Sequence, residues 1–170
     1  LDILVNNAGV YEPKLALDLT EEDWDRTIRI NLKGEFLCAQ RAAREMAKNK
    51  WGRIINIASI ASGGVGVGIA GGVHYTASKG GIIAMTETLA IEFAPLGITV
   101  NAIGPGAIDT PMASQKDIPK AMLDAILAGV PIKRMGRPEE VAAMAVFLAS
   151  EESSYVTGAT FYVDGGWLAM

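Results

Sequence analysis

Four short runs of apolar residues recur along the chain, and each ends at a polar or glycine-rich turn. They cover residues 3–5, 53–58, 98–103 and 160–163, and helical patterns fill the segments between them. Strands that alternate with helices pair in parallel, because each helix returns the chain to the same end of the sheet. The sequence therefore predicts an α/β fold with a doubly wound, Rossmann-like parallel sheet. The run at 3–5 reads as a strand buried on both faces.

The segments between these runs predict long helices and one less regular region. Helices are expected over about 20–48 and 74–93, and another begins at Pro138, where proline and two acidic residues form the first turn. The helix at 74–93 is apolar on nearly every side, so we expect the sheet to cover one side and a partner subunit the other. Residues of about 111–135 combine apolar side chains with prolines and are predicted to be a lid over a site.

Composition narrows the class of protein. At 170 residues the chain reads as a single domain, 1–170, with no linker that would divide it. The net charge is −4 with acids and bases interspersed, which argues against nucleic acid as the main partner. No apolar run reaches the roughly 18 residues of a membrane span, and no signal peptide is visible. We therefore predict a soluble, cytoplasmic protein with no membrane partner.

The chain has a single cysteine and a single histidine, which limits disulfide formation and metal binding. One Cys excludes an internal disulfide, and one Cys with one His makes a metal site of the zinc type unexpected. Cys38 is interpreted as a small core residue. The chain also starts at Leu1, directly inside a predicted buried strand. We therefore expect it to be the C-terminal part of a longer protein.

Tyr75 and Lys79 are the strongest candidates for catalysis. In the helix predicted at 74–93 they stand one turn apart on the same face. A free tyrosine has a pKa of about 10 and is a poor acid or base at neutral pH. An ammonium group one turn away favours the phenolate and should lower that pKa. This spacing alone also occurs by coincidence, so further residues must support it.

Three other positions are expected to converge on this pair. Ser59 follows a predicted strand, at the end where parallel sheets bind ligands, and can donate a hydrogen bond to a substrate oxygen. Asn31, in the middle of the helix at 20–48, can hold a water molecule. The turn from Pro105 and Gly106 to Thr110 follows the next strand and offers backbone groups to a ligand.

Taken together, these motifs resemble the short-chain dehydrogenase/reductase family, in its short single-domain branch. The resemblance covers the whole chain, and although each motif is weak alone, the order of all of them is specific. The matching elements are Asn6-Asn7-Ala8-Gly9, Asn31-x-x-Gly34, Ser59, Tyr75-x-x-x-Lys79, Pro105-Gly106 with Thr110, and Val163-Asp164-Gly165-Gly166.

The resemblance implies hydride transfer between a nicotinamide cofactor, NAD or NADP, and a ketone or secondary alcohol. It makes Tyr75 the general acid and base, and Lys79 the residue that lowers its pKa and binds the nicotinamide ribose. It also makes Ser59 the group that polarises the carbonyl and Asn31 the holder of a relay water. The implied cofactor-binding residues are Asn6, Ala8, Gly9, Tyr75, Lys79, Pro105, Gly106, Ile108 and Thr110.

The family resemblance also bears on substrate and assembly. The most similar members are 3-oxoacyl-carrier-protein reductases and dehydrogenases of sugars, polyols or cyclic alcohols. A homo-oligomer, a tetramer or dimer formed through the long helices, is expected with a small-molecule substrate. The alternative is a non-catalytic cofactor-sensing or scaffold protein of the same fold.

The sequence departs from the family pattern in two places. Family members often place the serine 13 residues before the tyrosine, which is the spacing of Ser62, whereas Ser59 lies 16 before it. We prefer Ser59 because it directly follows the strand. The first βαβ units, about 60–80 residues with the phosphate-binding glycine loop, are expected to be missing. Residues 66–71 match G-x-G-x-x-G, but they begin too far beyond the strand and are interpreted as a chance match.

Three further polar residues each have two interpretations. His74 is interpreted as a helix-start residue, although contact with a substrate stays an alternative. Arg134 and Arg137 are either surface charges or contacts to an anionic substrate, and the sequence does not separate these interpretations.

Overall fold

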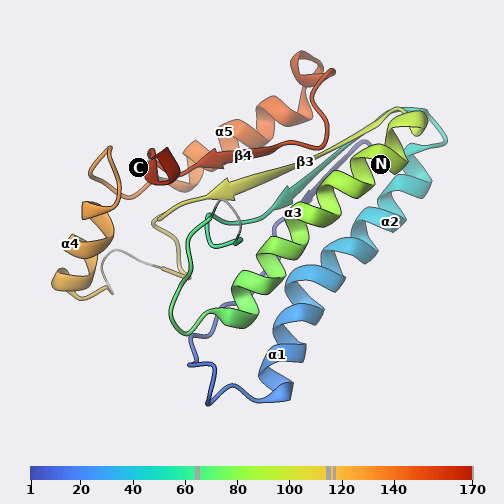
Figure 1. Cartoon of the computed structure of the whole chain (residues 1–170). Coiled ribbons are helices and arrows are strands. Elements are labelled where there is room, and N and C mark those ends of the chain that lie inside the picture. Colours follow the sequence, from blue (N-terminus) through green and yellow to red (C-terminus); the bar gives the residue numbers. More distant parts are fainter. Residues whose placement is uncertain (64–65, 114–115, 117, 170) are drawn as a thin grey trace.

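The computed structural model describes residues 1–63, 66–113, 116 and 118–169. Among these, four strands form one sheet in the order β1-β2-β3-β4, and every neighbouring pair is parallel (Figure 1). This confirms the predicted α/β class with a Rossmann-like parallel sheet. The strands are β1 Ile3–Asn6, β2 Gly52–Ile57, β3 Ile98–Pro105 and β4 Thr160–Val163.

Helices form a layer on each face of the sheet. Helices α1, α2 and α3 lie on one side and α5 on the other, while α4 lies beyond the carboxyl ends of the strands (Figure 1). Short 3-10 turns occur at Ala94–Leu96, Glu151–Ser153 and Trp167–Ala169. The helices are α1 Glu21–Ile28, α2 Gly34–Met46, α3 Val73–Phe93, α4 Lys120–Ala128 and α5 Pro138–Ala149.

The central strands are apolar because both of their faces are covered. On the face of α2 and α3, Ile54 packs in one core cluster with Val100 and Met46. Its neighbour Ile55 points to the opposite face and packs with Leu148 of α5. This period-two alternation, with a helix on each side, explains why the β2 segment reads as a continuous apolar run.

The prediction that the first strand is buried on both faces is wrong for one face. Leu4 packs against the core on the α2 and α3 side, but Ile3 is 42% and Val5 46% exposed. β1 is an edge strand of the sheet, and α5 packs on β2, β3 and β4. The uncovered side chains of β1 therefore face the side where the α5 layer stops.

The helix predicted over about 20–48 is interrupted at its middle. Thr20 caps its start and forms a capping box with Asp23. A π-helical turn, Arg29–Lys33, then separates α1 from α2 and contains Asn31. Such turns are rare and frequently accompany functional sites. The prediction that Cys38 lies in the core is wrong, because the helical period buries the adjacent Ala39 and leaves Cys38 exposed.

The predicted lid contains α4 and a buried anchor. No residue of α4 is buried, whereas Val130 and Met135, which follow it, are. Part of the predicted lid, residues 114, 115 and 117, lies outside the described residues. Whether this segment closes over a site stays a prediction.

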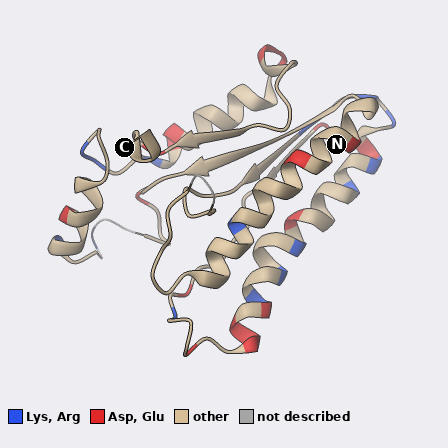
Figure 2. Ribbon diagram, in the orientation of Figure 1, with Lys and Arg blue, Asp and Glu red and all other residues tan. Residues whose placement is uncertain are grey.

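Charge is concentrated on the outer layers. Acidic and basic residues lie along α1 and α2, with the acids grouped in the first turn of α1, while the strands carry little charge (Figure 2). Among the described residues, no helix is both long and apolar enough to cross a membrane.

Gly97, which connects α3 to β3, offers a test of this fold. Its φ is +75°, and a Cβ added there would lie 2.0 Å from the backbone oxygen of Lys50. We expect Gly97→Ala to lower the free energy of unfolding by about 2 kcal/mol or more, because both the conformation and the space exclude a side chain. Urea denaturation of the full-length protein would measure this. Gly68→Ala is the control, because a Cβ there meets no atom within 4 Å, and it should change stability by less than about 1 kcal/mol.

Candidate active site

Tyr75 and Lys79 lie in the first turns of α3, at the end of the helix that faces the carboxyl ends of the strands. The Lys79 Nζ is 5.9 Å from the centroid of the Tyr75 ring. Lys79 is only 5% exposed, and its Nζ donates a hydrogen bond of 2.6 Å to the backbone oxygen of Ile57, the last residue of β2. The structure therefore holds a buried ammonium group at the end of the sheet beside the tyrosine.

Ser59, rather than Ser62, acts on the pKa of Tyr75, which its side chain lowers. The Ser59 Oγ accepts a hydrogen bond of 3.0 Å from the Ala61 N–H. Ser62 is buried as well, but its Oγ has no hydrogen-bond partner among the described residues. Ser59 follows β2, and its catalytic role, in preference to Ser62, stays a prediction.

The electrostatics of Tyr75 differ from the expectation. Burial raises the pKa of Tyr75 above its usual value, the hydrogen bond with Ser59 acts in the opposite direction, and the nearby Tyr11 raises it further. We predicted that Lys79 would lower this pKa. In the structure the ammonium is directed to Ile57 instead, so burial decides the direction and the hydroxyl keeps its proton at neutral pH.

Asn31 connects the loop after β1 to α3. Its Oδ1 accepts a hydrogen bond of 2.8 Å from the Val10 N–H, and its Nδ2 donates to the Val10 oxygen at 3.0 Å and to Ser78 Oγ at 3.2 Å. Ser78 in turn donates to the backbone oxygen of Tyr75 at 2.7 Å. The π-helical turn thus aims a fully buried amide at the segment that carries the tyrosine.

Gly9 lies beside both Asn31 and Lys79, whereas Asn6 lies deeper. A Cβ at Gly9 would be 3.6 Å from Asn31 Oδ1 and 3.8 Å from Lys79 Nζ, and the adjacent Ala8 is exposed. Asn6 is buried and donates to Asn56 Oδ1 at 2.9 Å and to the backbone oxygen of Glu35 at 3.2 Å. Gly9 and Ala8 therefore border the candidate site, and Asn6 supports it from below.

The residues predicted after β3 are less closely gathered. The Pro105 oxygen accepts a hydrogen bond from the Ile60 N–H, and the Gly106 N–H donates to the Val163 oxygen, both at 3.0 Å. The backbone oxygen of Thr110 accepts from the Ala113 N–H. These backbone groups bond within the protein, and Ile108 lines a cavity on the other side of the sheet.

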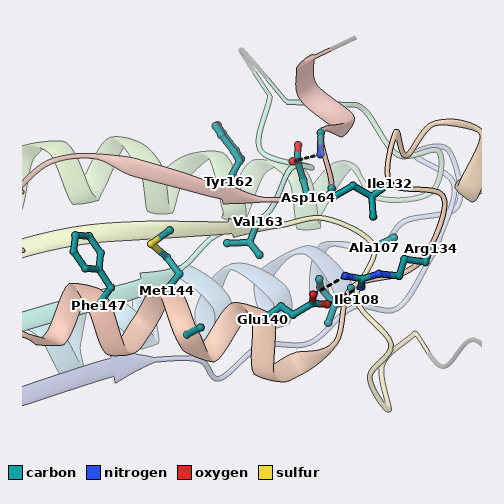
Figure 3. A pocket seen from close by; sticks show the side chains of 14 residues that line it. Ala107, Ile108, Ile132, Arg134, Glu140, Met144, Phe147, Tyr162, Val163 and Asp164 are labelled. Carbon is teal, nitrogen blue, oxygen red and sulfur yellow. Dashed lines mark hydrogen bonds and ion pairs between the residues drawn. The ribbon is translucent and has the colours of Figure 1, made fainter.

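That cavity has a volume of about 580 Å³ and lies between α5 and the ends of β3 and β4 (Figure 3). None of the four predicted catalytic residues lines it. Arg134 reaches Glu140 through two hydrogen bonds of 2.8 and 2.6 Å at its border, and Arg137 lies 3.6 Å from the same carboxylate. The structure thus pairs both arginines with Glu140.

Contacts within the protein also account for the remaining candidates. The His74 Nε2 lies 3.1 Å from the Glu12 oxygen, and the residue is buried at the start of α3. A Cβ at Gly66 would lie 2.1 Å from the Ile60 oxygen, and the Gly71 oxygen accepts a hydrogen bond from the Lys14 N–H. Close backbone packing therefore explains two glycines of the 66–71 segment. Among the described residues, no group of three or more potential ligands could hold a metal ion.

Two residues that the sequence reasoning missed lie at the site. The ring of Tyr11 contacts that of Tyr75, with centroids 4.9 Å apart and planes inclined at 52°. Glu35 is 3% exposed, and its Oε1 lies 3.9 Å from Lys79 Nζ. Glu35 follows Asn31 by four residues, and this one-turn spacing could have indicated it. Tyr11 lies in an irregular loop and left no comparable signal.

The fold and these contacts define a class. A parallel sheet has helices on both faces, and the serine, tyrosine and lysine meet beyond the carboxyl ends of its strands, where α/β sheets of the Rossmann-like kind bind ligands. The model of the family described as enoyl-(acyl carrier protein) reductase matches residues 1–168. The chain belongs to the short-chain dehydrogenase/reductase family, and its relatives are oxidoreductases.

Three similar proteins illustrate this. The 3-oxoacyl-acyl-carrier-protein reductase of Thermotoga maritima is 46% identical over 98% of this chain and 65% of its own length. A subunit of the (2S)-((R)-hydroxy(phenyl)methyl)succinyl-CoA dehydrogenase of Thauera aromatica is 45% identical over 98% of this chain and 64% of its own length. A solved structure from Agrobacterium tumefaciens, provisionally assigned as a gluconate dehydrogenase, is 40% identical and has a TM-score of 0.95. The match covers 100% of this chain and 66% of that protein's chain. The chain thus spans about two thirds of the length of these proteins.

The buried Glu35 predicts a pH dependence of stability. Burial raises its pKa to about 8, although Lys79 acts in the opposite direction. A carboxyl group whose pKa is raised by folding stabilises the fold most when the pH is below its pKa in the unfolded state, about 4.5. This contribution is lost as the pH rises to about 8. Between pH 5 and 8, we expect the free energy of unfolding to fall less steeply with pH in Glu35→Gln than in the wild type. The two slopes should differ by up to about 1.4 kcal/mol per pH unit.

Urea denaturation of the full-length protein at several pH values would measure these slopes. Glu45→Gln is the matched control on α2, because Glu45 forms ion pairs with Arg41 and Lys48 at the surface. Its slope between pH 5 and 8 should equal that of the wild type. Equal slopes for Glu35→Gln and the wild type would contradict the assignment.

Proposed function

We propose that this chain carries the catalytic part of an NAD(P)-dependent short-chain dehydrogenase or ketoreductase, which interconverts a ketone and a secondary alcohol. The observation that carries the proposal is the buried ammonium of Lys79, which is bonded to the Ile57 oxygen at the end of β2 and lies 5.9 Å from the centroid of the Tyr75 ring. A phenol, a hydroxyl and a fixed positive charge at one point suit proton transfer to an oxygen atom. The oxidoreductase relatives support the reaction class.

The site residues divide the work of carbonyl reduction. Because the pKa of Tyr75 is raised, its hydroxyl is protonated at neutral pH and can give its proton to the substrate oxygen. Ser59 would hold that oxygen through a hydrogen bond. The Lys79 charge would stabilise the phenolate that remains, and the same steps reversed would make Tyr75 the base in alcohol oxidation.

The residues around Gly9 would suit a nicotinamide cofactor. A Cβ at Gly9 would lie 3.6 Å from Asn31 Oδ1 and 3.8 Å from Lys79 Nζ, so glycine leaves these two polar groups uncovered. Gly9, Ala8 and Lys79 would hold the nicotinamide and its ribose there, and Asn31 would fix the loop that contains Gly9. When bound, the cofactor supplies or accepts the hydride.

Substrate and assembly are proposals of the same kind. We propose that residues of about 111–135 form the substrate lid, because α4 carries exposed apolar side chains such as Met122. We also propose a cytoplasmic homo-oligomer, a dimer or tetramer formed through α2 and α3. The exposed apolar side chains Phe36, Leu37 and Ile91 on these helices support a subunit contact.

Replacement of Tyr75 tests the activity. In the full-length protein, Tyr75→Phe should lower kcat for ketone reduction by about 100- to 10,000-fold, because the proton donor is lost while the ring remains. Oxidation of NADH or NADPH would be followed with a panel of ketones and β-keto thioesters. Tyr155→Phe is the control, because Tyr155 is fully exposed, and it should keep the wild-type rate.

The outcomes separate the two candidate functions. An unchanged rate in Tyr75→Phe would rule out the proposed chemistry. Tight cofactor binding by the wild type without turnover of any substrate would favour a non-catalytic cofactor-sensing or scaffold protein.

The length of the relatives leads to a second test. We expect the 170-residue chain alone to be poorly stable and inactive and to bind NAD(H) and NADP(H) more than about 100-fold more weakly than the protein extended to its relatives' length. A phosphate cradle in such proteins lies on earlier strands, and the β1 edge is uncovered. Calorimetry would measure both affinities. Equal affinities, or cooperative melting of the chain alone, would contradict this proposal.

A further inference from the structure

A carboxyl group without a hydrogen-bond partner lies next to the lysine of the candidate site. Neither side-chain oxygen of Glu35 has a hydrogen-bond partner among the described residues, and the residue is 3% exposed. Its Oε1 lies 3.9 Å from Lys79 Nζ, which itself donates to the Ile57 oxygen. An unpartnered buried carboxyl group is costly and uncommon. Its position points to a role that acts through Lys79.

The surroundings isolate this pair from other charges. Helix α3 contributes Lys79 and, one turn before it, Tyr75. Strands β1 and β2 contribute the uncharged amides of Asn6 and Asn56. The other charged side chains of the adjoining elements are directed elsewhere: Arg29 and Lys33 of the π-helical turn are exposed, and Arg53 of β2 lies by Glu151.

We propose that Glu35 is a positioning residue that acts on Tyr75 through Lys79, by adding or removing one negative charge beside the ammonium. The proposal rests on the proposed function of Tyr75 and Lys79. With Glu35 protonated, the pair carries one positive charge, and with Glu35 ionised it carries none. A positive charge favours the phenolate. Because ionisation of Glu35 cancels that charge, Tyr75 becomes a weaker proton donor, and a smaller fraction of it is present as the phenolate base.

Burial sets the pH at which this change occurs. It raises the pKa of Glu35 to about 8, with Lys79 opposing, and it lowers the pKa of Lys79, with Glu35 opposing. Both shifts arise because charge is poorly solvated in the interior. The charge beside Lys79 therefore changes near pH 8, within the range where such a reaction is measured.

Glu35→Gln in the full-length protein tests the proposal. Glutamine has the shape of the protonated carboxyl group and cannot ionise. We expect the ratio of variant to wild-type kcat to be close to one at pH 6 and to rise to about two- to fivefold at pH 9. The reference reaction is reduction, by NADH or NADPH, of the ketone that the wild type turns over fastest.

Glu45→Gln is the matched control from the same helix, since its carboxylate lies at the surface between Arg41 and Lys48. Its ratio should stay near one from pH 6 to 9. A Glu35→Gln ratio that stays near one throughout would overturn the proposal. So would an equal loss of rate at every pH, because that is the result of a purely structural role.

The test separates this proposal from the proposed function. If Tyr75→Phe keeps the wild-type rate, the proposed chemistry fails, and the role of Glu35 in it fails too. If Tyr75→Phe is inactive while the Glu35→Gln ratio does not change with pH, only the role of Glu35 is wrong. The pH dependence of unfolding shows independently whether Glu35 titrates near pH 8.

Discussion

The candidate site depends on one buried ammonium group. Lys79 is held at the end of β2 by the Ile57 oxygen, with the Glu35 carboxyl group on another side and the Tyr75 ring within 6 Å. A buried charge is tolerated only where such groups surround it. The end of the sheet, the π-helical turn and α3 therefore have to meet at the place where this lysine lies.

The parallel sheet makes that meeting possible. Ser59 follows β2 and Gly9 follows β1, and parallel pairing brings both strand ends to the same edge. The π-helical turn directs Asn31 across this edge to Val10 and Ser78. Loops and helix starts that lie far apart in the chain thus share one small region, while the layers behind them are packed with apolar side chains.

Some elements and site residues could be predicted from the sequence, and others could not. The strands at 53–58, 98–103 and 160–163 and the helices at 74–93 and from Pro138 were predictable, because apolar period and helix caps are local signals. Ser59 and the Tyr75–Lys79 pair followed from spacing and from family resemblance. The exposure of β1 and of Cys38 was not predictable, since each depends on which neighbour covers a face. Ile108 lines the separate cavity by α5, and its contact with the cofactor stays a prediction.

The amino-acid sequence by itself determined the α/β class, the order of the elements and the residue types available for proton transfer, because these depend on local periodicity and composition. Only the tertiary structure decided the direction of the pKa of Tyr75, the partner of Lys79 and the burial of Glu35. These properties depend on distance and on access of water, which arise only when β2, α2 and α3 pack together. An i, i+4 spacing places two side chains on one face, but packing decides which group each side chain contacts.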